Sequence, residues 1–351
     1  MKIRDNSYNS ISVAKGIGII CMVVGHSGCP SVMRDFIYMF HMPLFFILSG
    51  YCFKEKYLSD FKTFARKRAV GLYVPFIKYG ILFLLLHNIF YRIGIYNSEY
   101  GSGIASVYYD LKTIALHFAQ LFFLINYEQL ISPVWFIAAL FVGYFIFYAA
   151  SRYVKDFRIG GLILLAIALF LVPAGHSSHP IVYRSALAAL YLWGGHFLSF
   201  KYNELNKWWV CLFCFVIVGV GAVLFATEMP KVDYHTFFPY LICSVAGSLM
   251  ILIVSQWISQ KNSIISNIVG YMGDHTMSIL IWHFTSFKIV SLIILYIKGM
   301  PILMVAKFPT ITGEVPNCFW YIYVAVGIIL PLLIDKSSSI IKRKFNNVVW
   351  K

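Results

Sequence analysis

Apolar runs of near-spanning length recur along this chain and constrain its fold more than any other feature. A segment inside hydrocarbon must satisfy its own backbone hydrogen bonds, which an α-helix of about 20 apolar residues does. We therefore expect an all-α, polytopic membrane bundle of about ten transmembrane helices. Their expected ranges are 11–29, 36–53, 72–91, 133–150, 159–174, 182–199, 207–226, 236–258, 275–297 and 318–334.

Charge is scarce in the chain and unevenly placed. Only 12% of the residues are charged, whereas a soluble domain carries about 25%. With the N-terminus inside, the inner segments hold three times as many Lys and Arg residues as the outer ones. This bias predicts that both termini are cytoplasmic and that the protein crosses the cell (inner or plasma) membrane many times. The excess of Lys and Arg in the inner segments thus accounts for most of the net charge of +15. The lipid bilayer is the expected partner, and no nucleic-acid partner is expected.

The domain organisation follows from the same pattern. No apolar run has both a basic segment before it and a convincing small-residue cleavage site after it, and the first run is long enough to span, so we expect it to remain uncleaved. The longest loop, 92–132, contains a short apolar run at 114–126 that is expected to be interfacial or re-entrant. We expect one membrane-embedded domain, residues 1–351.

The first two runs hold the most informative polar residues. The break at Pro30–Asp35 is too short for a domain and predicts an antiparallel helical hairpin. Lys15, His26 and His41 lie within the apolar runs, where an ionisable residue indicates a functional site by default. Lys15 and His26 are separated by close to three helical turns, so they are predicted to share one helix face, about 16 Å apart.

Each of these residues also has a structural interpretation. The imidazole of His26 can act as a general base near pH 7, or it can be bonded to another helix. Lys15 can contact an anionic ligand, or extend its ammonium to the inner interface. His41 is the second candidate catalytic histidine, with a helix–helix hydrogen bond as its alternative. Pro43 predicts a kink close to it.

Three adjacent cations, Arg66, Lys67 and Arg68, follow the second run at its inner end. They suit a polyphosphate ligand and anionic lipid headgroups equally well. Trp135 and His283 are possible lining residues of a site, and anchoring at the membrane interface is the alternative for Trp135.

No metal site is expected. Cys211 and Cys214 fall within one apolar helix and have no partner pair, which is typical of small buried hydrophobes. His176 and His179 have a ligand-like spacing, but they lie in a short loop without carboxylates.

Several motifs together resemble one known family. In chain order they are AKGIGIICMVVGHSG, FHMPLFFILSGY, ARKR before GLYVPF, PVWFIAALF and VGYMGDHTMSILIWHF. This series resembles acyltransferase family 3, integral-membrane acyltransferases that modify sugars, and looks closest to the fucose 4-O-acetylase-like branch. The resemblance covers nearly the whole chain, and its strongest part is the spacing of Lys15 and His26.

The resemblance implies a function and a set of roles. The family transfers an acyl group, usually acetyl from cytoplasmic acetyl-CoA, to a hydroxyl of a cell-surface glycan or lipid-linked sugar. His26 matches the catalytic histidine, and Lys15 matches a basic residue that engages the acyl donor, to which Arg66, Lys67 and Arg68 would add further donor contacts. Ser12 departs from the pattern, because the family often has an acidic residue there.

A membrane transporter or flippase for an anionic or sugar substrate is the alternative function. Many spans, intramembrane cations and a kinked helix would suit a transporter. Transporter halves often show internal symmetry, and none is visible in this sequence.

Overall fold

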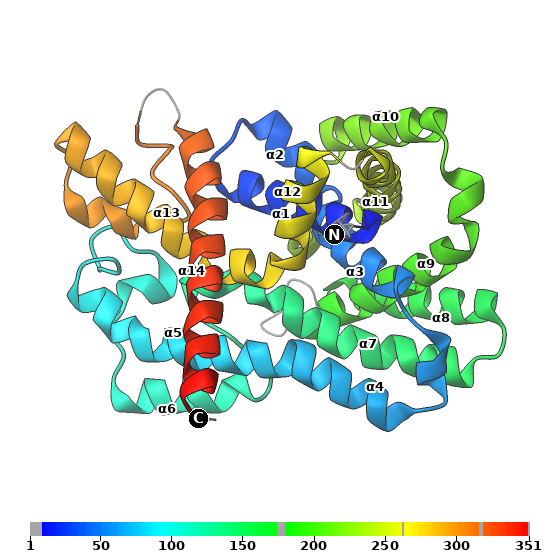
Figure 1. Ribbon diagram of the computed structural model, residues 1–351, viewed down its shortest axis with the longest axis horizontal. Helices are drawn as coiled ribbons and strands as arrows, with labels where there is room; N and C mark the ends of the chain where they lie inside the picture. Colours follow the sequence, from blue (N-terminus) through cyan, green and yellow to red (C-terminus); the bar gives the residue numbers. More distant parts are fainter. Residues whose placement is uncertain (1–8, 174–179, 262, 316–318, 350–351) are drawn as a thin grey trace. The chain divides into compact units, whose positions relative to one another are not determined.

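Every regular element in the described part of the chain is helical in the computed structural model (Figure 1). The structure describes residues 9–173, 180–261, 263–315 and 319–349, with side chains as far as residue 340, so His176 and His179 lie outside it. Six helical segments within these ranges are long and apolar enough to cross a membrane. They are 31–51, 61–92, 129–153, 237–260, 276–298 and 320–340. The prediction of an all-α polytopic membrane protein is confirmed.

The helices follow the expected order of apolar runs, and each expected span contains one. They are α1 (Ser10–His26), α2 (Ser31–Tyr38), α3 (His41–Tyr51), α4 (Phe61–Arg68), α5 (Val74–Arg92), α6 (Leu111–Leu121), α7 (Trp135–Tyr153), α8 (Phe157–Phe170), α9 (Ile181–Leu205), α10 (Trp208–Leu224), α11 (Phe237–Gln260), α12 (Ile264–Asp274), α13 (Thr276–Lys298) and α14 (Trp320–Val349). A π-helical turn at Ala69–Tyr73 joins α4 to α5, and short 3-10 turns at Gln129–Val134 (η4) and Ile302–Ala306 (η7) precede α7 and follow α13. The number of segments that cross the bilayer and the orientation of the termini stay predictions.

The break between the first two runs differs from the expectation in its details. The residues 30–35, expected as a turn, are mostly helical, because α2 begins at Ser31 directly after Pro30. The kink expected at Pro43 lies instead at Phe40, where φ is −145°. Pro43 is the third residue of α3, a position whose N–H has no partner within the helix, so proline is tolerated there without a kink.

The chain divides into two compact units. The first comprises residues 1–22, 30–78 and 135–273, and the second comprises 23–29, 79–134 and 274–351. In the first unit α9 packs against α3, α7 and α8, and α10 packs against α11 (Figure 1). In the second unit α13 packs along α14 and against η4.

Two glycines allow α3 and α9 to pack closely in the first unit. A Cβ atom on Gly50 of α3 would collide with the Leu192 carbonyl oxygen of α9. A Cβ on Gly195 of α9 would collide in turn with the Ile47 carbonyl oxygen of α3. Small residues at membrane helix interfaces permit such backbone approach, which maximises van der Waals contact where no hydrophobic effect drives association.

This crossing predicts opposite outcomes for two neighbouring glycines. Gly195→Ala should destabilise the protein by about 1–3 kcal/mol, because backbone atoms must move to admit the methyl group. Gly194→Ala is the matched control, since a Cβ there has nothing within 4 Å and alanine favours helix over glycine. Thermal midpoints of the purified variants in the same detergent measure the difference. Equal midpoints would show that α3 and α9 can separate without cost.

Side-chain contacts fasten α13 to α14 in the second unit. The hydroxyls of Ser291 and Tyr323 lie 2.9 Å apart, and Ser278 Oγ donates to the Pro331 carbonyl at 2.8 Å. Proline at 331 has no N–H, so a carbonyl one turn earlier in α14 lacks its usual helical donor. The carbonyl of Pro331 itself accepts the hydrogen bond from Ser278. Polar side chains thus add to apolar packing along this helix pair.

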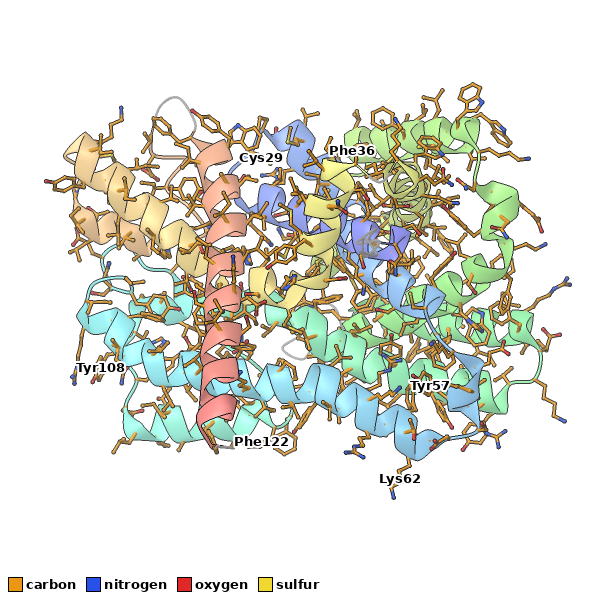
Figure 2. The ribbon with its side chains drawn as sticks, in the orientation of Figure 1. Cys29, Phe36, Tyr57, Lys62, Tyr108 and Phe122 are labelled. Carbon is orange, nitrogen blue, oxygen red and sulfur yellow. The ribbon has the colours of Figure 1, made fainter. Side chains whose placement is uncertain are left out.

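Exposed side chains on several helices are apolar, as a bilayer requires. On α10 the residues Leu212, Phe213, Val216 and Val220 are each more than half exposed. The charged side chain of Lys62 points away from the α4 ribbon (Figure 2). A water-soluble protein rarely exposes an apolar face of this length, whereas such a face suits lipid.

Candidate active site

His26 is the last residue of α1 and belongs to the second unit. Its half-buried ring stacks on the His283 ring of α13, with centroids 5.7 Å apart and planes inclined by 25°. The Phe284 ring meets it edge-on at 5.1 Å. Gly28 follows with a φ of +79°, and a Cβ there would collide with Thr312, so the chain turns sharply just after His26. The helix end therefore presents this imidazole against α13, partly open.

His283 is fully buried, and its hydrogen bonds define its tautomer. Nδ1 lies 3.0 Å from the carbonyl oxygens of both Ile279 and Leu280. A carbonyl only accepts, so Nδ1 carries the proton. In the neutral ring Nε2 then holds a lone pair, and this buried atom has no hydrogen-bond partner among the described residues. The arrangement leaves one acceptor nitrogen available beside His26.

A buried lysine, which the sequence analysis passed over, secures the loop near this pair. Lys288 of α13 is 1% exposed, and its ammonium donates to the carbonyls of Val305 at 2.8 Å and Lys307 at 2.7 Å. The same ammonium lies 5.6 Å from the centroid of the Phe308 ring. Phe308 packs on Phe284 at 4.5 Å. An intramembrane Lys is itself a signal of function, and that signal was present at position 288.

Lys15 and His41 lie in the first unit, apart from His26 and His283 in the division of the chain. Lys15 is half-buried on α1. Burial raises the pKa of the Cys52 thiol, and the positive charges of Lys15 and Lys54 oppose this rise. These three residues therefore share one electrostatic environment at the end of α3. Lys15 and His26 both belong to α1, and their position on one face of that helix stays a prediction.

His41 begins α3 and contacts the end of α2. Its Nδ1 lies 3.0 Å from the Ile37 carbonyl oxygen, one turn earlier, and its ring lies 5.1 Å from that of Tyr38. This bond bridges the break between α2 and α3, and it adds a side-chain contact to a carbonyl that also accepts from the Phe40 N–H at 3.2 Å. A structural contribution of His41 to the break is therefore visible, and its catalytic role stays a prediction.

The three adjacent cations of α4 have different surroundings, because neighbouring residues on a helix point to different sides. The Arg68 guanidinium lies 3.8 Å from the centroid of the Tyr144 ring. Lys67 Nζ donates to the Tyr57 hydroxyl at 2.9 Å, and this hydrogen bond lowers the pKa of Tyr57. The Arg66 side chain is exposed. Arg68 is thus held by an aromatic ring, whereas Arg66 faces solvent or lipid headgroups.

Trp135 opens α7 and pairs with a cation from another helix. The Arg184 guanidinium of α9 lies 4.9 Å from the centroid of its ring. Arg184 Nε is buried and has no hydrogen-bond partner in the described part of the chain. A cation against an indole face is a favourable contact, which gives Trp135 a role in packing besides its predicted place in the site.

The geometry groups the candidate residues into two sets. Lys15, His41, Trp135 and the α4 cations lie in the first unit, and His26 and His283 lie together in the second. Within the described ranges, no three His, Cys, Asp or Glu side chains gather as metal ligands. Two stacked imidazoles, one half-buried and one whose neutral form has a free lone pair on Nε2, can take up and pass on a proton.

The fold and this site define a multi-pass helical membrane protein with an imidazole pair as its candidate active site. A family model described as an acyltransferase domain matches residues 8–336, almost the whole chain. The chain belongs to acyltransferase family 3 and is a membrane acyltransferase. Comparison with curated proteins and with solved structures gives no match. The nearer likeness to the fucose 4-O-acetylase-like branch stays a prediction.

Proposed function

We propose that this protein moves an acetyl group from cytoplasmic acetyl-CoA to a hydroxyl of a cell-surface glycan or lipid-linked sugar. The contact between His26 and His283 carries the proposal, because it places a partly open imidazole beside a second imidazole with an unpaired nitrogen. Membership of the acyltransferase family supports the reaction class. The acetyl donor and sugar acceptor follow from the resemblance of the motifs.

In the proposed reaction, the acceptor hydroxyl attacks the thioester carbonyl while His26 takes the hydroxyl proton. The new carbon–oxygen bond forms as the carbon–sulfur bond breaks, and the CoA thiolate leaves and receives the proton from the imidazolium. Alternatively His26 attacks the thioester first and carries the acetyl group to the hydroxyl. Both routes use an unprotonated His26 nitrogen at the start.

The donor would approach from the cationic side. CoA carries phosphates, and a polyanion cannot enter hydrocarbon, so it binds where cations gather. Lys15 and the α4 cations supply positive charge within the first unit. By the charges of the loops, the α4 cations would lie on the cytoplasmic side of the inner or plasma membrane. The acceptor sugar would then be met on the outer side.

A transfer assay tests the proposal directly. The purified chain in lipid nanodiscs should release CoA from acetyl-CoA only when a sugar acceptor is present, and the sugar should gain an acetyl ester detected by mass spectrometry. Release of CoA without any acetyl ester on a sugar would contradict the proposal that a sugar is the acceptor. Sugar uptake into vesicles without acetyl-CoA consumption would favour a transporter.

The stacked position of Arg68 predicts unequal effects within the α4 cations. Arg68→Gln should raise the KM for acetyl-CoA about tenfold, because a charged hydrogen bond from an ordered side chain to phosphate is lost. Arg66→Gln should raise it less, since an exposed side chain must first be ordered on binding. Lys62→Gln on the same helix is the control, and initial rates against acetyl-CoA concentration give the three values. An unchanged KM in all three variants would show that these residues do not bind the donor, and would favour contact with lipid headgroups as their role.

A further inference from the structure

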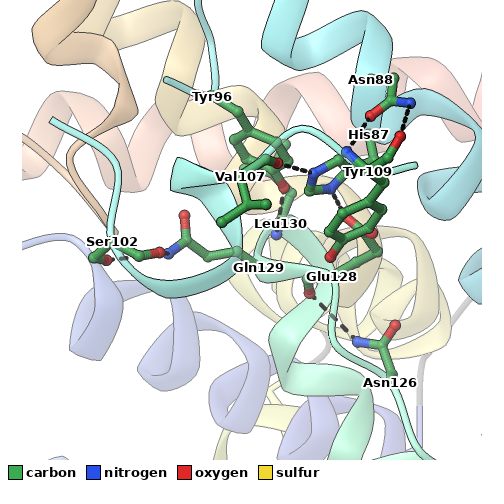
Figure 3. A network of polar contacts seen from close by, with 10 residues as sticks. All are labelled: His87, Asn88, Tyr96, Ser102, Val107, Tyr109, Asn126, Glu128, Gln129 and Leu130. Atoms are coloured by element: carbon green, nitrogen blue, oxygen red, sulfur yellow. Dashed lines mark hydrogen bonds and ion pairs between the residues drawn. The ribbon is translucent and has the colours of Figure 1, made fainter. Parts of the chain in front are cut away.

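A buried polar network in the second unit joins His87 of α5 to Glu128 (Figure 3). His87 Nδ1 lies 3.1 Å from Glu128 Oε2, and His87 Nε2 lies 2.9 Å from the Val107 carbonyl oxygen. The space beside Glu128 has room for about one water molecule. This network therefore fastens the loop at Val107 to α5 and leaves no space for a larger ligand.

Tyr57 of the first unit combines a buried ring with a hydroxyl that reaches an exposed cation. It lies in a 3-10 turn, η1 (Glu55–Leu58), between α3 and α4 (Figure 2). Its ring packs against Phe53 and Phe64, with centroids 6.0 and 6.4 Å away. Lys67, whose Nζ donates to the Tyr57 hydroxyl at 2.9 Å, is exposed. The protein thus fixes the ring and holds its hydroxyl beside an exposed ammonium group.

The Tyr57 hydroxyl keeps its own proton available for a ligand. An ammonium group only donates, so the tyrosine oxygen is the acceptor in the bond with Lys67. In the described part of the chain the hydroxyl proton has no acceptor of its own. The hydrogen bond from Lys67 and the charges of Lys67, Arg68 and Lys56 lower the pKa of Tyr57. A hydroxyl polarised in this way is a stronger donor toward an anion.

The acidic side chains of this turn are directed away from the Tyr57 hydroxyl. Glu55 Oε1 lies 3.8 Å from His196 Nε2 of α9. Asp60 Oδ1 accepts a hydrogen bond from the Thr63 N–H at the start of α4. The charges that act on Tyr57 come instead from lysine and arginine, so the local field attracts an anion.

Contacts with α7 hold this cluster in place before any ligand binds. The Arg68 guanidinium lies 3.8 Å from the centroid of the Tyr144 ring and 5.9 Å from that of Tyr57. Tyr148 Oη donates to the Leu58 carbonyl at 3.2 Å and so attaches η1 to α7. Groups that are already ordered lose less conformational entropy on binding. One hydroxyl, one ammonium and one guanidinium therefore form a pre-ordered group of donors around Tyr57.

This group of donors suits a phosphate monoester. A monoester has a charge approaching −2 near neutral pH and three free oxygens that accept hydrogen bonds. A phosphate within a diester or a diphosphate bridge has fewer free oxygens and less charge. Lysine and arginine form charge-assisted hydrogen bonds to such oxygens. CoA carries one phosphate monoester, on the ribose of its adenosine, besides its diphosphate bridge.

We propose that Tyr57, Lys67 and Arg68 bind the ribose phosphate monoester of CoA and so select CoA over donors that lack this phosphate. The identity of the ligand as the acyl donor rests on the proposed function, whereas the preference for a phosphate monoester rests on the cluster itself. Phosphatidic acid, a lipid whose headgroup is a phosphate monoester, offers the same chemistry and is distinguished by the probes below.

The binding of CoA and of dephospho-CoA tests the site without any catalysis, because the two ligands differ only in the ribose monoester. In phosphatidylcholine nanodiscs the unaltered protein should bind CoA at least about tenfold more tightly, through charged hydrogen bonds to the monoester. Tyr57→Phe keeps the ring and removes the hydroxyl, so the affinity for CoA should fall about tenfold while that for dephospho-CoA stays the same. Lys67→Gln should give the same selective loss. Isothermal titration calorimetry measures the dissociation constants.

Matched controls and a lipid probe complete the experiment. Tyr153→Phe, at an exposed tyrosine that ends α7, and Lys62→Gln on α4 should change neither affinity. Phosphatidic acid added to the nanodiscs is the lipid probe, because a lipid that binds only the folded state raises the thermal midpoint.

The outcomes separate this proposal from the proposed function. Equal affinity of the unaltered protein for the two ligands overturns the site, and so does an equal loss of both ligands in Tyr57→Phe, the pattern of a merely structural tyrosine. Stabilisation by phosphatidic acid that Tyr57→Phe abolishes, with unchanged CoA affinity, overturns the CoA assignment in favour of lipid. Selective loss of CoA supports the site even where no acetyl transfer is found, which would place the failure in the proposed reaction. Transfer from acetyl-dephospho-CoA with the same KM as from acetyl-CoA would leave the proposed function intact and overturn the site.

Discussion

His26→Ala should reduce acetyl transfer by at least about 10²- to 10⁴-fold, the contribution of a positioned general base. The half-buried ring stands against His283 and Phe284, and α1 ends at this residue. Alanine therefore shortens no helix and buries no charge. The measurement is the initial rate with saturating acetyl-CoA and sugar, normalised to the amount of folded protein in the membrane.

His26→Gln sharpens this experiment because it separates a base from a hydrogen-bonding group. Glutamine can donate and accept hydrogen bonds but takes up no proton near neutral pH, so we expect the same loss as with alanine. His41→Gln should be milder, since the Nδ1 contact of His41 to Ile37 can be replaced by the amide. Substantial activity of His26→Gln would mean that His26 is structural, and the search for the base would move to His283.

The sequence predicted the fold class well because membrane physics leaves few choices. Apolar runs near 20 residues long dictate helices, and each expected span contains one. The kink expected at Pro43 lies at Phe40 instead. A proline in the first turn costs no hydrogen bond, and the unusual backbone at Phe40 has no signature in its apolar side chain.

The candidate site was predictable only in part. Intramembrane histidines are rare enough that His26 and His283 could be singled out, but their contact joins residues far apart in the sequence. Lys288 carries the same signal as an ionisable residue within an apolar run, but its partners are carbonyls of a loop whose path the sequence does not define. The His87–Glu128 contact joins a helix to a loop across forty-one residues, and no spacing rule predicts such a pairing.

Lys288→Met should lower kcat by about 10²-fold, the cost of misplacing a reacting group by about an ångström. The lysine ammonium holds the carbonyls of Val305 and Lys307, and the next residue, Phe308, packs on Phe284. Phe284 in turn contacts both His26 and His283. Methionine fills the same space but donates no hydrogen bond, so the loop loses its attachment and the aromatic support of the two imidazoles shifts.

The kinetic pattern identifies this effect as one of position. Loss of orientation should lower kcat and leave the KM for acetyl-CoA nearly unchanged, whereas loss of a donor contact would raise that KM. Lys298→Met, at the exposed end of the same α13, is the matched control and should keep full activity. Thermal midpoints establish that both variants are folded, since replacing a buried ammonium by an apolar group need not destabilise. Full kcat in folded Lys288→Met would show that His26 keeps its orientation without the loop, and that α13 alone positions the pair.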